Sequence, residues 1–194
     1  MRRFFAMLLL SLVCFIAKSE TIELANFQDG FGKEQSIKLA LEDGKPWAVI
    51  IPCQKEDETY GFIVQPINYV FALESYLNEI KEKYNEWTQT AISNGIDEYE
   101  KKFMASGYQY GFIWFNPEKR QGISGLNAVW KYDKDKDINL VELDAKVVDT
   151  LGSYEITTFK LRFLRVEDID CILNAISQSN IKAHTPVTAD SLFK

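Results

Sequence analysis

The sequence predicts an α+β fold: a largely antiparallel sheet of about seven strands, covered by a long central amphipathic helix and a C-terminal helix. Between residues 67 and 94, apolar side chains recur every three or four positions, which places them on one face of a helix. On both sides of this segment, apolar and polar residues alternate with the period of two that is typical of half-buried strands. No linker or low-complexity segment divides the chain, so we expect one domain over residues 20–194, with a loosely held tail at 184–194.

The first residues have the pattern of an export signal. Arg2 and Arg3 precede an apolar run over residues 4–17, and small residues at Ala17 and Ser19 flank a cleavage point. The run has 14 residues, fewer than the roughly 20 that a spanning helix needs. We therefore expect a signal peptide over residues 1–19 and an exported mature protein, periplasmic or extracellular, without stable membrane insertion. An uncleaved anchor is the alternative.

A short strand near residues 21–25 and three further strands are expected before the long helix. Residues 37–41 place Ile or Leu at every second position, as in a strand with one buried face. After the turn-forming Asp43-Gly44 pair, residues 47–51 are all apolar, as in a strand covered on both faces. The next predicted strand covers residues 60–65 and ends before the helix.

The helix over residues 67–94 carries a continuous apolar stripe, and its opposite face is polar. Asn94 and Gly95 provide a C-terminal stop, because both residues tolerate the left-handed conformation. We expect the stripe to pack on the sheet of a monomer; a coiled coil between two chains is the alternative for a heptad-like pattern. The stripe comprises Val70, Leu73, Leu77, Ile80, Tyr84, Trp87 and Ala91.

Two shorter helices are expected in the second half of the chain. Asp97 and Glu100 have the spacing of a capping box, which favours a short helix after Gly95. Residues 166–179 have a helical apolar period, and the acidic residues in its first turn favour the positive end of the helix dipole.

Between these two helices the sequence period changes to two. Apolar and polar residues alternate in four segments joined mostly by short links, the pattern of an antiparallel meander. The four predicted strands lie near residues 108–115, 126–132, 141–147 and 155–164.

The charge of the chain argues against nucleic acid as a partner. The formal net charge is −6, and removal of the three basic residues among residues 1–19 leaves 19 basic against 28 acidic residues, or −9. Such a surface repels phosphate backbones and anionic membranes.

Two cysteines, Cys53 and Cys171, remain after cleavage of the signal. An oxidising compartment would permit a disulfide between them. However, a domain of this size buries enough apolar surface without one. We expect both thiols to be reduced or too far apart to bond.

The sequence contains little that points to catalysis. The single histidine, His184, lies in the predicted tail, which argues against a histidine-based triad, a Cys-His nucleophile and a multi-histidine zinc site. No Gly-rich phosphate loop follows a strand, so we expect no cofactor. Carboxylate chemistry stays open, because two acids about 5 to 9 Å apart suffice for glycoside hydrolysis and no sequence spacing identifies them.

One acidic run resembles a calcium loop in its spacing. Asp133, Asp135 and Asp137 alternate, and Asp144 occupies the twelfth position. The sixth position is Ile138 where such loops need Gly, and the flanking segments are predicted strands. These four aspartates are weak metal candidates, and we expect a solvated turn without bound metal.

The strongest ligand candidate is the link over residues 116–125. Its ten residues exceed the usual two to five of a hairpin loop, and it contains a basic pair in an acidic protein. Aromatic residues on both sides could stack on a sugar or a partner protein. The alternatives are a solvated loop without a partner, and aromatic rings that belong to the core. The predicted ligand-binding residues are Trp114, Lys119, Arg120, Trp130 and Tyr132.

These observations favour a small exported, acidic, non-catalytic module that binds a protein or a saccharide. One alternative is a carboxylate-dependent enzyme acting on glycans, which two acids with opposite pKa shifts would favour. Another is an envelope inhibitor or immunity-type protein, which a contiguous negative patch would favour.

Overall fold

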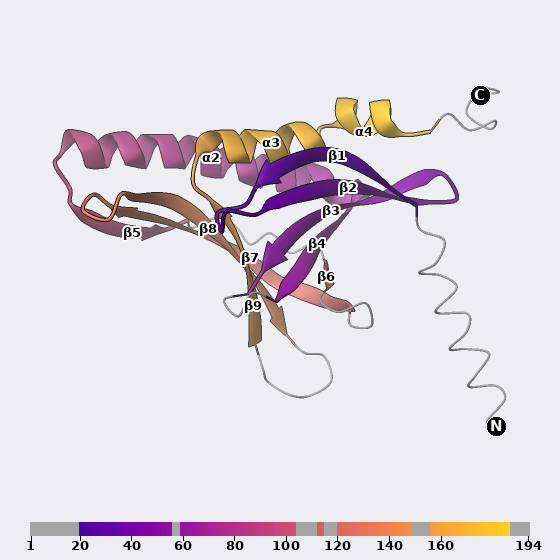
Figure 1. The fold of residues 1–194 in the computed structure, drawn as a ribbon, viewed down its shortest axis with the longest axis horizontal. Helices are drawn as coiled ribbons and strands as arrows, with labels where there is room; N and C mark the ends of the chain where they lie inside the picture. The colour runs from indigo at the N-terminus through magenta and orange to yellow at the C-terminus, as the bar shows by residue number, and fades with distance from the viewer. Residues whose placement is uncertain (1–19, 56–58, 104–111, 115–119, 149–155, 187–194) are drawn as a thin grey trace.

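The computed structural model describes residues 20–55, 59–103, 112–114, 120–148 and 156–186. The predicted signal peptide and most of the predicted tail lie outside these ranges. The predicted α+β class is confirmed: one antiparallel sheet is covered by a long helix and C-terminal helices (Figure 1). Among the described residues this sheet has nine strands, two more than expected.

The elements before the long helix follow the predicted order. Four strands are followed by a short 3₁₀ turn and the 24-residue helix α2. Their bounds are β1 Glu20–Gln28, β2 Glu34–Glu42, β3 Lys45–Gln54, β4 Tyr60–Pro66, η1 Ile67–Tyr69 and α2 Val70–Ser93.

The second half of the chain contributes five strands and two helices. Their bounds are β5 Glu98–Lys102, β6 Phe112–Trp114, β7 Arg120–Asp133, β8 Ile138–Val148, β9 Ile156–Phe163, α3 Val166–Ile176 and α4 Gln178–His184.

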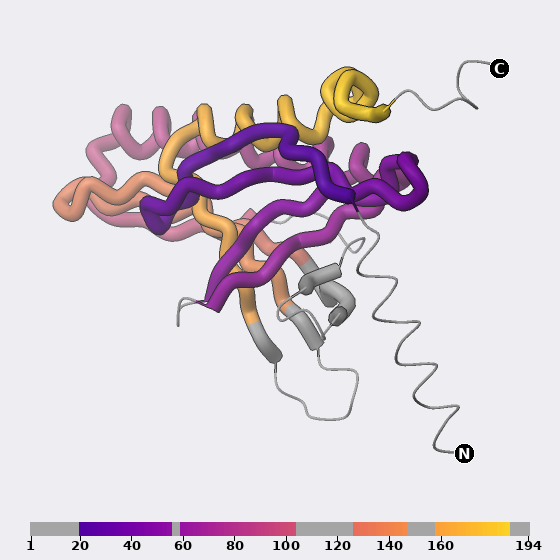
Figure 2. Tube along the Cα trace, turned by 45° about the vertical axis from the view of Figure 1, so that its right-hand side comes forward, coloured from indigo at the N-terminus to yellow at the C-terminus, as the bar shows by residue number. Residues whose placement is uncertain are grey.

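The sheet curls until it nearly closes on itself. Its strands follow the order β1-β2-β3-β4-β6-β7-β8-β9, and β9 returns to β3 through the single pair Lys160–Gln54. Six strands from β3 to β9 therefore form a ring, while the β1–β2 hairpin extends from one side and β5 from the other (Figure 2). We call the face toward the ring interior and the helices the inner face, and the opposite one the outer face.

Helices α2 and α3 lie across the wide end of the curled sheet, and α4 follows at its edge (Figure 1). The predicted stripe of α2 is buried, except for Trp87, which is partly buried against the same core. The stripe thus packs within one chain, as predicted. None of the described helices is both long and apolar enough to span a membrane.

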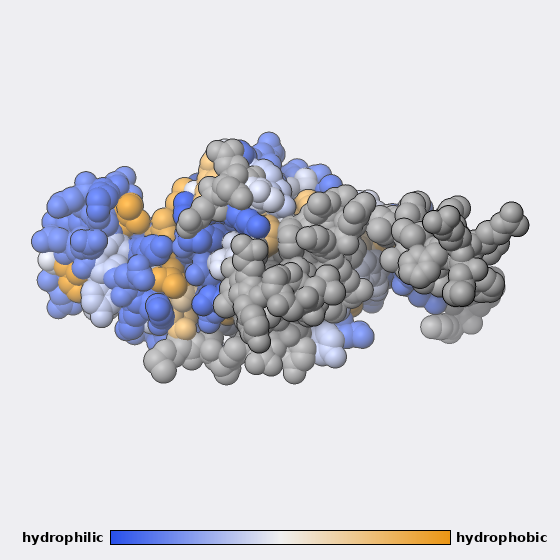
Figure 3. All heavy atoms as spheres, turned by 90° about the horizontal axis from the view of Figure 1, so that it is seen from below, coloured by the Kyte–Doolittle hydropathy of each residue, from blue (hydrophilic) through white to orange (hydrophobic). Residues whose placement is uncertain are grey.

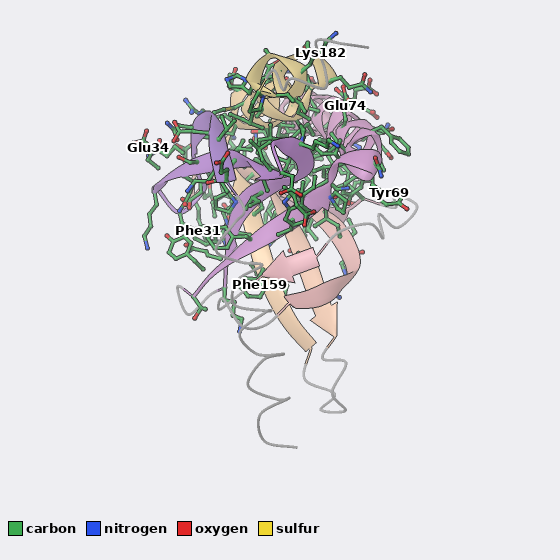
Figure 4. The ribbon with its side chains drawn as sticks, turned by 90° about the vertical axis from the view of Figure 1, so that its right-hand side faces the viewer. Phe31, Glu34, Tyr69, Glu74, Phe159 and Lys182 are labelled. Carbon is green, nitrogen blue, oxygen red and sulfur yellow. The ribbon has the colours of Figure 1, made fainter. Side chains whose placement is uncertain are left out.

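The narrow end of the ring is filled by an aromatic side chain. Phe159 on β9 is fully buried and lies against Gly61 on β4 (Figure 4). A Cβ atom at position 61 would be 2.5 Å from the Phe159 ring, so β4 needs glycine for this close approach. The inner face is therefore a continuous core from the helices down to Phe159.

The predicted short helix after Gly95 is wrong. Glu98–Lys102 is strand β5, which pairs antiparallel with the last part of β7. The backbone oxygen of Asp97 accepts a hydrogen bond from the Lys134 amide at 2.8 Å, which anchors the start of this pairing. The capping box would stabilise a helix here less than the backbone hydrogen bonds to the long strand β7 stabilise a strand.

The predicted last helix is divided in two. Helix α3 ends at Ile176, and Ser177 begins α4 by accepting a hydrogen bond from the Asn180 amide through its hydroxyl. At the start of α3, the Asp168 carboxylate accepts a hydrogen bond from the Arg165 backbone amide. An acidic residue in the first turn thus interacts favourably with the N-terminal end of the helix, as predicted.

Strand β3 is not covered as completely as predicted. Val49 and Ile51 lie in the main core on the inner face, and Ala48 belongs to a small buried cluster on the outer face. Trp47 and Ile50 are only partly buried against that small cluster. The outer side of β3 therefore has a thin apolar layer instead of a second core.

The two cysteines of the described chain are free thiols, as predicted. Cys53 is buried on the inner face of β3, where burial raises the pKa of its thiol well above the ordinary range. Cys171 on α3 lies near the Asn26 backbone oxygen, at 3.3 Å.

Candidate ligand site on the outer face of the sheet

The structure shortens the link that the sequence singled out. Trp114 ends β6 and pairs with Arg120, the first residue of β7, so the connection spans residues 115–119 only. The expectation of a ten-residue loop over 116–125 is wrong, because its second half belongs to β7. Lys119, and the side chains of Trp114 and Arg120, lie outside the described part of the chain.

The structure also separates Trp130 and Tyr132 from this link. Both lie at the other end of β7, beside β5, where Tyr132 pairs with Tyr99. Trp130 is only 2% exposed and donates its indole N–H to Asn139 at 2.9 Å, so it is a core residue. At this end of the molecule, apolar atoms appear in small groups between hydrophilic ones (Figure 3). The predicted ligand residues therefore do not form one site.

The acidic run forms the tight turn between β7 and β8. Asp133 accepts hydrogen bonds from the backbone and the side-chain nitrogen of Lys136, and Asp137 has a positive φ of 54°. Asp144 lies apart from these residues, on the outer face of β8. Within the described ranges, no group of three or more His, Cys, Asp or Glu side chains is arranged to hold a metal ion.

The most unusual polar arrangement is a cluster on the outer face, which contains none of the predicted ligand-binding residues. It lies where β7, β8, β9, β3 and β4 run side by side in the ring. Val141, Leu143 and Ala145 on the inner face of β8 are apolar and fully buried, whereas Glu142 and Asp144 between them face cations on the neighbouring strands. This outer-face cluster comprises Gln54, Tyr60, Lys131, Glu142, Asp144, Lys160 and Arg162.

Glu142 is the buried centre of the cluster. Its side chain is 3% exposed, and one carboxylate oxygen accepts hydrogen bonds from Lys131 at 3.1 Å and from Lys160 at 2.9 Å. The other oxygen accepts two bonds from Arg162, at 2.6 and 3.0 Å. Burial alone would raise the pKa of this carboxyl, but these charged hydrogen bonds outweigh burial and lower the pKa to about 2.

Asp144, two residues along the same strand, has the opposite environment. Burial raises the pKa of its carboxyl, and nearby Lys160 only partly opposes this effect. Its Oδ1 atom is buried and has no hydrogen-bond partner among the described residues. The charged form of Asp144 is therefore poorly compensated, in contrast to Glu142.

Two further side-chain oxygens, in a row of residues that runs across the sheet from Asp144, are also buried without a hydrogen-bond partner. Cross-strand pairing runs from Asp144 to Lys160, from Lys160 to Gln54, and from Gln54 to Tyr60, so the four residues form a line across β8, β9, β3 and β4. Gln54 Oε1 and the Tyr60 hydroxyl are both buried without a partner in the described structure. The fourth such oxygen belongs to Gln65, whose strand partner Val49 lies on the inner face.

The turn between β1 and β2 lies against the cluster. The Gly30 amide donates to the Arg162 backbone oxygen at 3.0 Å, and a Cβ atom at position 30 would be 2.6 Å from the Arg162 side chain. The Phe31 ring lies 4.3 Å from the Arg162 guanidinium, and Lys33 Nζ lies 5.0 Å from the Tyr60 ring. In Figure 4, Phe31 lies at the side of the molecule, below the helices.

This turn is held in shape by one buried carboxylate. Asp29 accepts hydrogen bonds from the amides of Phe31 and Lys33 and from the side chain of Gln35, at 2.8 to 3.1 Å. Because glycine at position 30 permits the close approach to β9, the turn and the cluster form one surface.

Part of the cluster could have been found from sequence. Glu142 and Asp144 alternate with apolar residues on one predicted strand, and Lys160 and Arg162 do so on the next. The pairing of β9 with β3, which adds Gln54 and Tyr60, has no local sequence signal.

No protein-family model matches the chain, and neither the curated proteins nor the solved structures include one with significant similarity to it.

Proposed function

We propose that the protein is an exported, non-catalytic binding module whose ligand binds at the outer-face cluster. The observation that carries this proposal is the row of three buried side-chain oxygens without partners, on Gln54, Tyr60 and Asp144. Buried polar atoms are hydrogen-bonded in the great majority of cases, and each exception destabilises the fold by about 1–3 kcal/mol. A ligand that supplies hydrogen-bond donors would satisfy these oxygens.

The geometry favours a saccharide over a protein as that ligand. Gln54 Oε1 and Asp144 Oδ1 are acceptors, and sugar hydroxyls are compact donors. Asp144 and Gln54 are two strands apart, a span of about 10 Å at ordinary strand spacing. This span suits one or two sugar rings, whereas a protein partner needs a contact surface of about 800 Å².

A carboxylate enzyme is the second candidate, because Glu142 and Asp144 have the opposite pKa shifts that such an enzyme requires. The surroundings of Glu142 argue against this role. Its carboxylate is 3% exposed and bound by three cations, so neither oxygen is available to a water molecule or a sugar. Glu142 is better explained as the counter-ion that holds Lys160 and Arg162 in place.

An inhibitor or immunity-type role would require a contiguous negative surface. On the solvent side of α2, the acidic residues are interspersed with Lys81 and Lys83. Lys83 pairs with Glu86 on the same helix, and Lys81 pairs with Asp170 on α3. This part of the described surface is therefore mixed in charge, which supports the saccharide proposal over this one.

Binding to a glycan array, followed by calorimetric titration of the glycans that bind, tests the proposal. Tyr60→Phe removes one hydroxyl from the row and should weaken binding by roughly five- to tenfold, as expected for loss of one hydrogen bond. Tyr99→Phe is the matched control, because Tyr99 is 50% exposed at the far end of the sheet. Equal affinities of both variants and the wild type would move the site elsewhere.

A further inference from the structure

Strand β5 leaves one border of the sheet open. It pairs with β7 along one edge, and no other described strand pairs with its second edge. Figure 1 shows β5 below α2, outside the ring of strands. All five of its side chains are exposed. Because an open strand edge presents unpaired backbone groups, it can accept a further strand.

The hydrogen bonds at the two ends of the β5–β7 pairing show which backbone groups of β5 are free. The Lys134 amide donates to the Asp97 oxygen at 2.8 Å, and the Phe103 amide donates to the Ala128 oxygen at 2.9 Å. Hydrogen bonding alternates along an antiparallel strand, so the odd-numbered residues of this segment are directed towards β7. The residues whose N–H and C=O groups are directed towards the open edge are Glu98, Glu100 and Lys102.

The order of charges along β5 is complementary to that of a second copy. The strand contains acidic residues in its first part and lysines at its end. In an antiparallel pair of two β5 strands centred on Glu100, Glu98 lies opposite the partner's Lys102 at both ends of the pair. In a parallel pair, residues of like charge would lie opposite one another.

The charges on β5 are not already neutralised. In the described part of the chain, none of the three residues directed towards the open edge forms an ion pair. Asp133, the β7 partner of Glu98, pairs with Lys136 instead. Lys131, the β7 partner of Glu100, pairs with Glu142. Residues 104–111, which follow the strand, contain no charged side chain.

We propose that β5 is a dimerisation edge, at which a second copy of this chain adds its own β5 antiparallel, with two-fold symmetry about Glu100. Glu100 exchanges both backbone hydrogen bonds with the same residue of the partner, and Glu98 exchanges both with the partner's Lys102. The two sheets join into one. This proposal goes beyond the proposed binding function and does not depend on it.

This register is the one that uses every open backbone group of β5. The open groups occur at every second residue, so the partner strand can shift only by two residues. A shift in either direction leaves one open residue of each strand without a partner in β5. In one direction it also places Glu98 opposite the partner's Glu100, which is unfavourable.

Two exposed apolar side chains at this end of the molecule add contact area. Tyr99 on β5 is 50% exposed, and Ile92, in the last turn of α2 before β5, is 58% exposed. In the proposed register, Tyr99 lies opposite the partner's Lys101, whose aliphatic part can cover the ring. Association therefore buries apolar surface in addition to pairing the backbones.

The opposite border of the sheet is protected from such pairing. Strand β1 has a bulge between Glu23 and Ala25, and α3 and α4 pack against it. The Cys171 thiol on α3 lies 3.3 Å from the Asn26 backbone oxygen. A bulge and a covering helix both hinder the addition of a strand. The pairing of β5 with β7 has no bulge, so β5 is the better edge for a partner.

The dimer should be weak. The two Glu100 side chains lie opposite each other at the symmetry axis, and like charges in this position are destabilising. Two five-residue strands also form a small interface, in the class of weak contacts that bury less than about 1,200 Å². We therefore expect reversible association that depends on protein concentration.

Sedimentation velocity of the purified protein, from about 10 µM to about 1 mM, measures this association. Lys102→Glu places two acidic residues opposite each other at both ends of the pair and should weaken dimerisation roughly tenfold or more. Lys45→Glu makes the same change of charge at the exposed start of β3, and as the matched control it should leave the dimer unchanged. A protein that stays monomeric at every concentration would overturn the proposal.

Two further variants test the register. Glu98→Lys combined with Lys102→Glu places opposite charges in both cross-strand pairs again and should restore dimerisation. Glu100→Gln removes the like-charge pair at the axis and should strengthen the dimer roughly two- to fivefold. If the double variant stays as weak as Lys102→Glu alone, the two strands do not pair in this register.

A proline variant tests the backbone pairing separately from the charges. The Glu100 amide is directed towards the open edge, so Glu100→Pro keeps the hydrogen bonds to β7 and removes the central donor of the dimer. Dimerisation should be lost, while the melting temperature stays within a few degrees of the wild type. Lys101→Pro is the control, because it removes an amide directed towards β7 and should lower the melting temperature.

The results are independent of ligand binding. A dimer that persists in both Glu100→Pro and Lys102→Glu would overturn β5 as the interface. Glycan binding at the outer-face cluster should be the same in these variants as in the wild type, because none of the substituted residues belongs to that cluster. Loss of the dimer with unchanged glycan binding would support this proposal and leave the binding function untouched.

Discussion

The inner and outer faces of strands β8 and β9 are built from alternate residues of the same two segments, yet they differ in composition and in their contribution to the protein. The inner face carries apolar side chains that are fully buried, such as Leu143 and Phe163. The outer face contains Glu142, with four charged hydrogen bonds, and Asp144, with an oxygen that has no partner. The inner face therefore stabilises the fold, whereas the outer face retains polar groups that a purely structural surface would not need.

The largest effect should come from the inner face. Phe163→Ala would leave a cavity beneath the helices and destabilise the protein by about 3–5 kcal/mol. Denaturant unfolding measures this change. Phe71→Ala is the control, because Phe71 is 64% exposed on α2 and its loss should change stability by less than about 0.5 kcal/mol. Similar effects for both variants would show that the inner face is not the core.

A smaller but still large effect is expected at Glu142. Glu142→Gln leaves three cations without their counter-ion and should destabilise the protein by roughly 2–3 kcal/mol at neutral pH. Glu86→Gln is the matched control, because Glu86 lies in an exposed pair with Lys83 on α2, where solvent screens the charges, and its loss should change stability much less than that of Glu142.

The pH dependence of unfolding tests the same contact. The pKa of Glu142 falls from its ordinary value of 4.5 to about 2 in the folded protein. The folded state is therefore stabilised at pH values above 4.5, and this stabilisation, up to roughly 3 kcal/mol, is lost as the pH falls from about 4.5 towards 2. The Glu142→Gln variant should not lose stability over this pH range. If its stability depends on pH in the same way as that of the wild type, Glu142 is not the group with the lowered pKa.

Asp144 should behave in the opposite way. Because burial raises its pKa in the folded protein, its ionisation at neutral pH destabilises the fold, and stability rises as the pH falls through that raised pKa. Asp144→Asn should therefore leave the melting temperature at neutral pH unchanged or raise it by a few degrees, while sugar binding weakens. A clear loss of stability would show that Asp144 is structural in the same sense as Glu142.

The smallest effect is expected at the β7–β8 turn. Calcium at millimolar concentration should leave the melting temperature unchanged within about 1 °C, because the Asp133 carboxylate is already paired with Lys136. Magnesium at the same concentration controls for ionic strength. A rise of the melting temperature with calcium but not with magnesium would show that the acidic run binds calcium.

The α+β class, the long helix and most of the strands could be predicted from the sequence alone. These features depend on the period of apolar residues along the chain, and each period is complete within one segment. The stripe from Val70 to Ala91 and the alternation around Glu142 are examples, and both occur in the structure. The two free cysteines also agree with the expectation from length and composition.

The places where polar residues from different strands meet depend on how the strands pair in three dimensions. The capping-box spacing at Asp97 was overridden by the pairing of β5 with β7, and the link after Trp114 was shortened by the pairing of β6 with β7. The single pair between Lys160 and Gln54 brings the row of unpartnered oxygens together across a separation of about a hundred residues. Strand pairing of this kind depends on the folding of the whole sheet, so no local pattern records it.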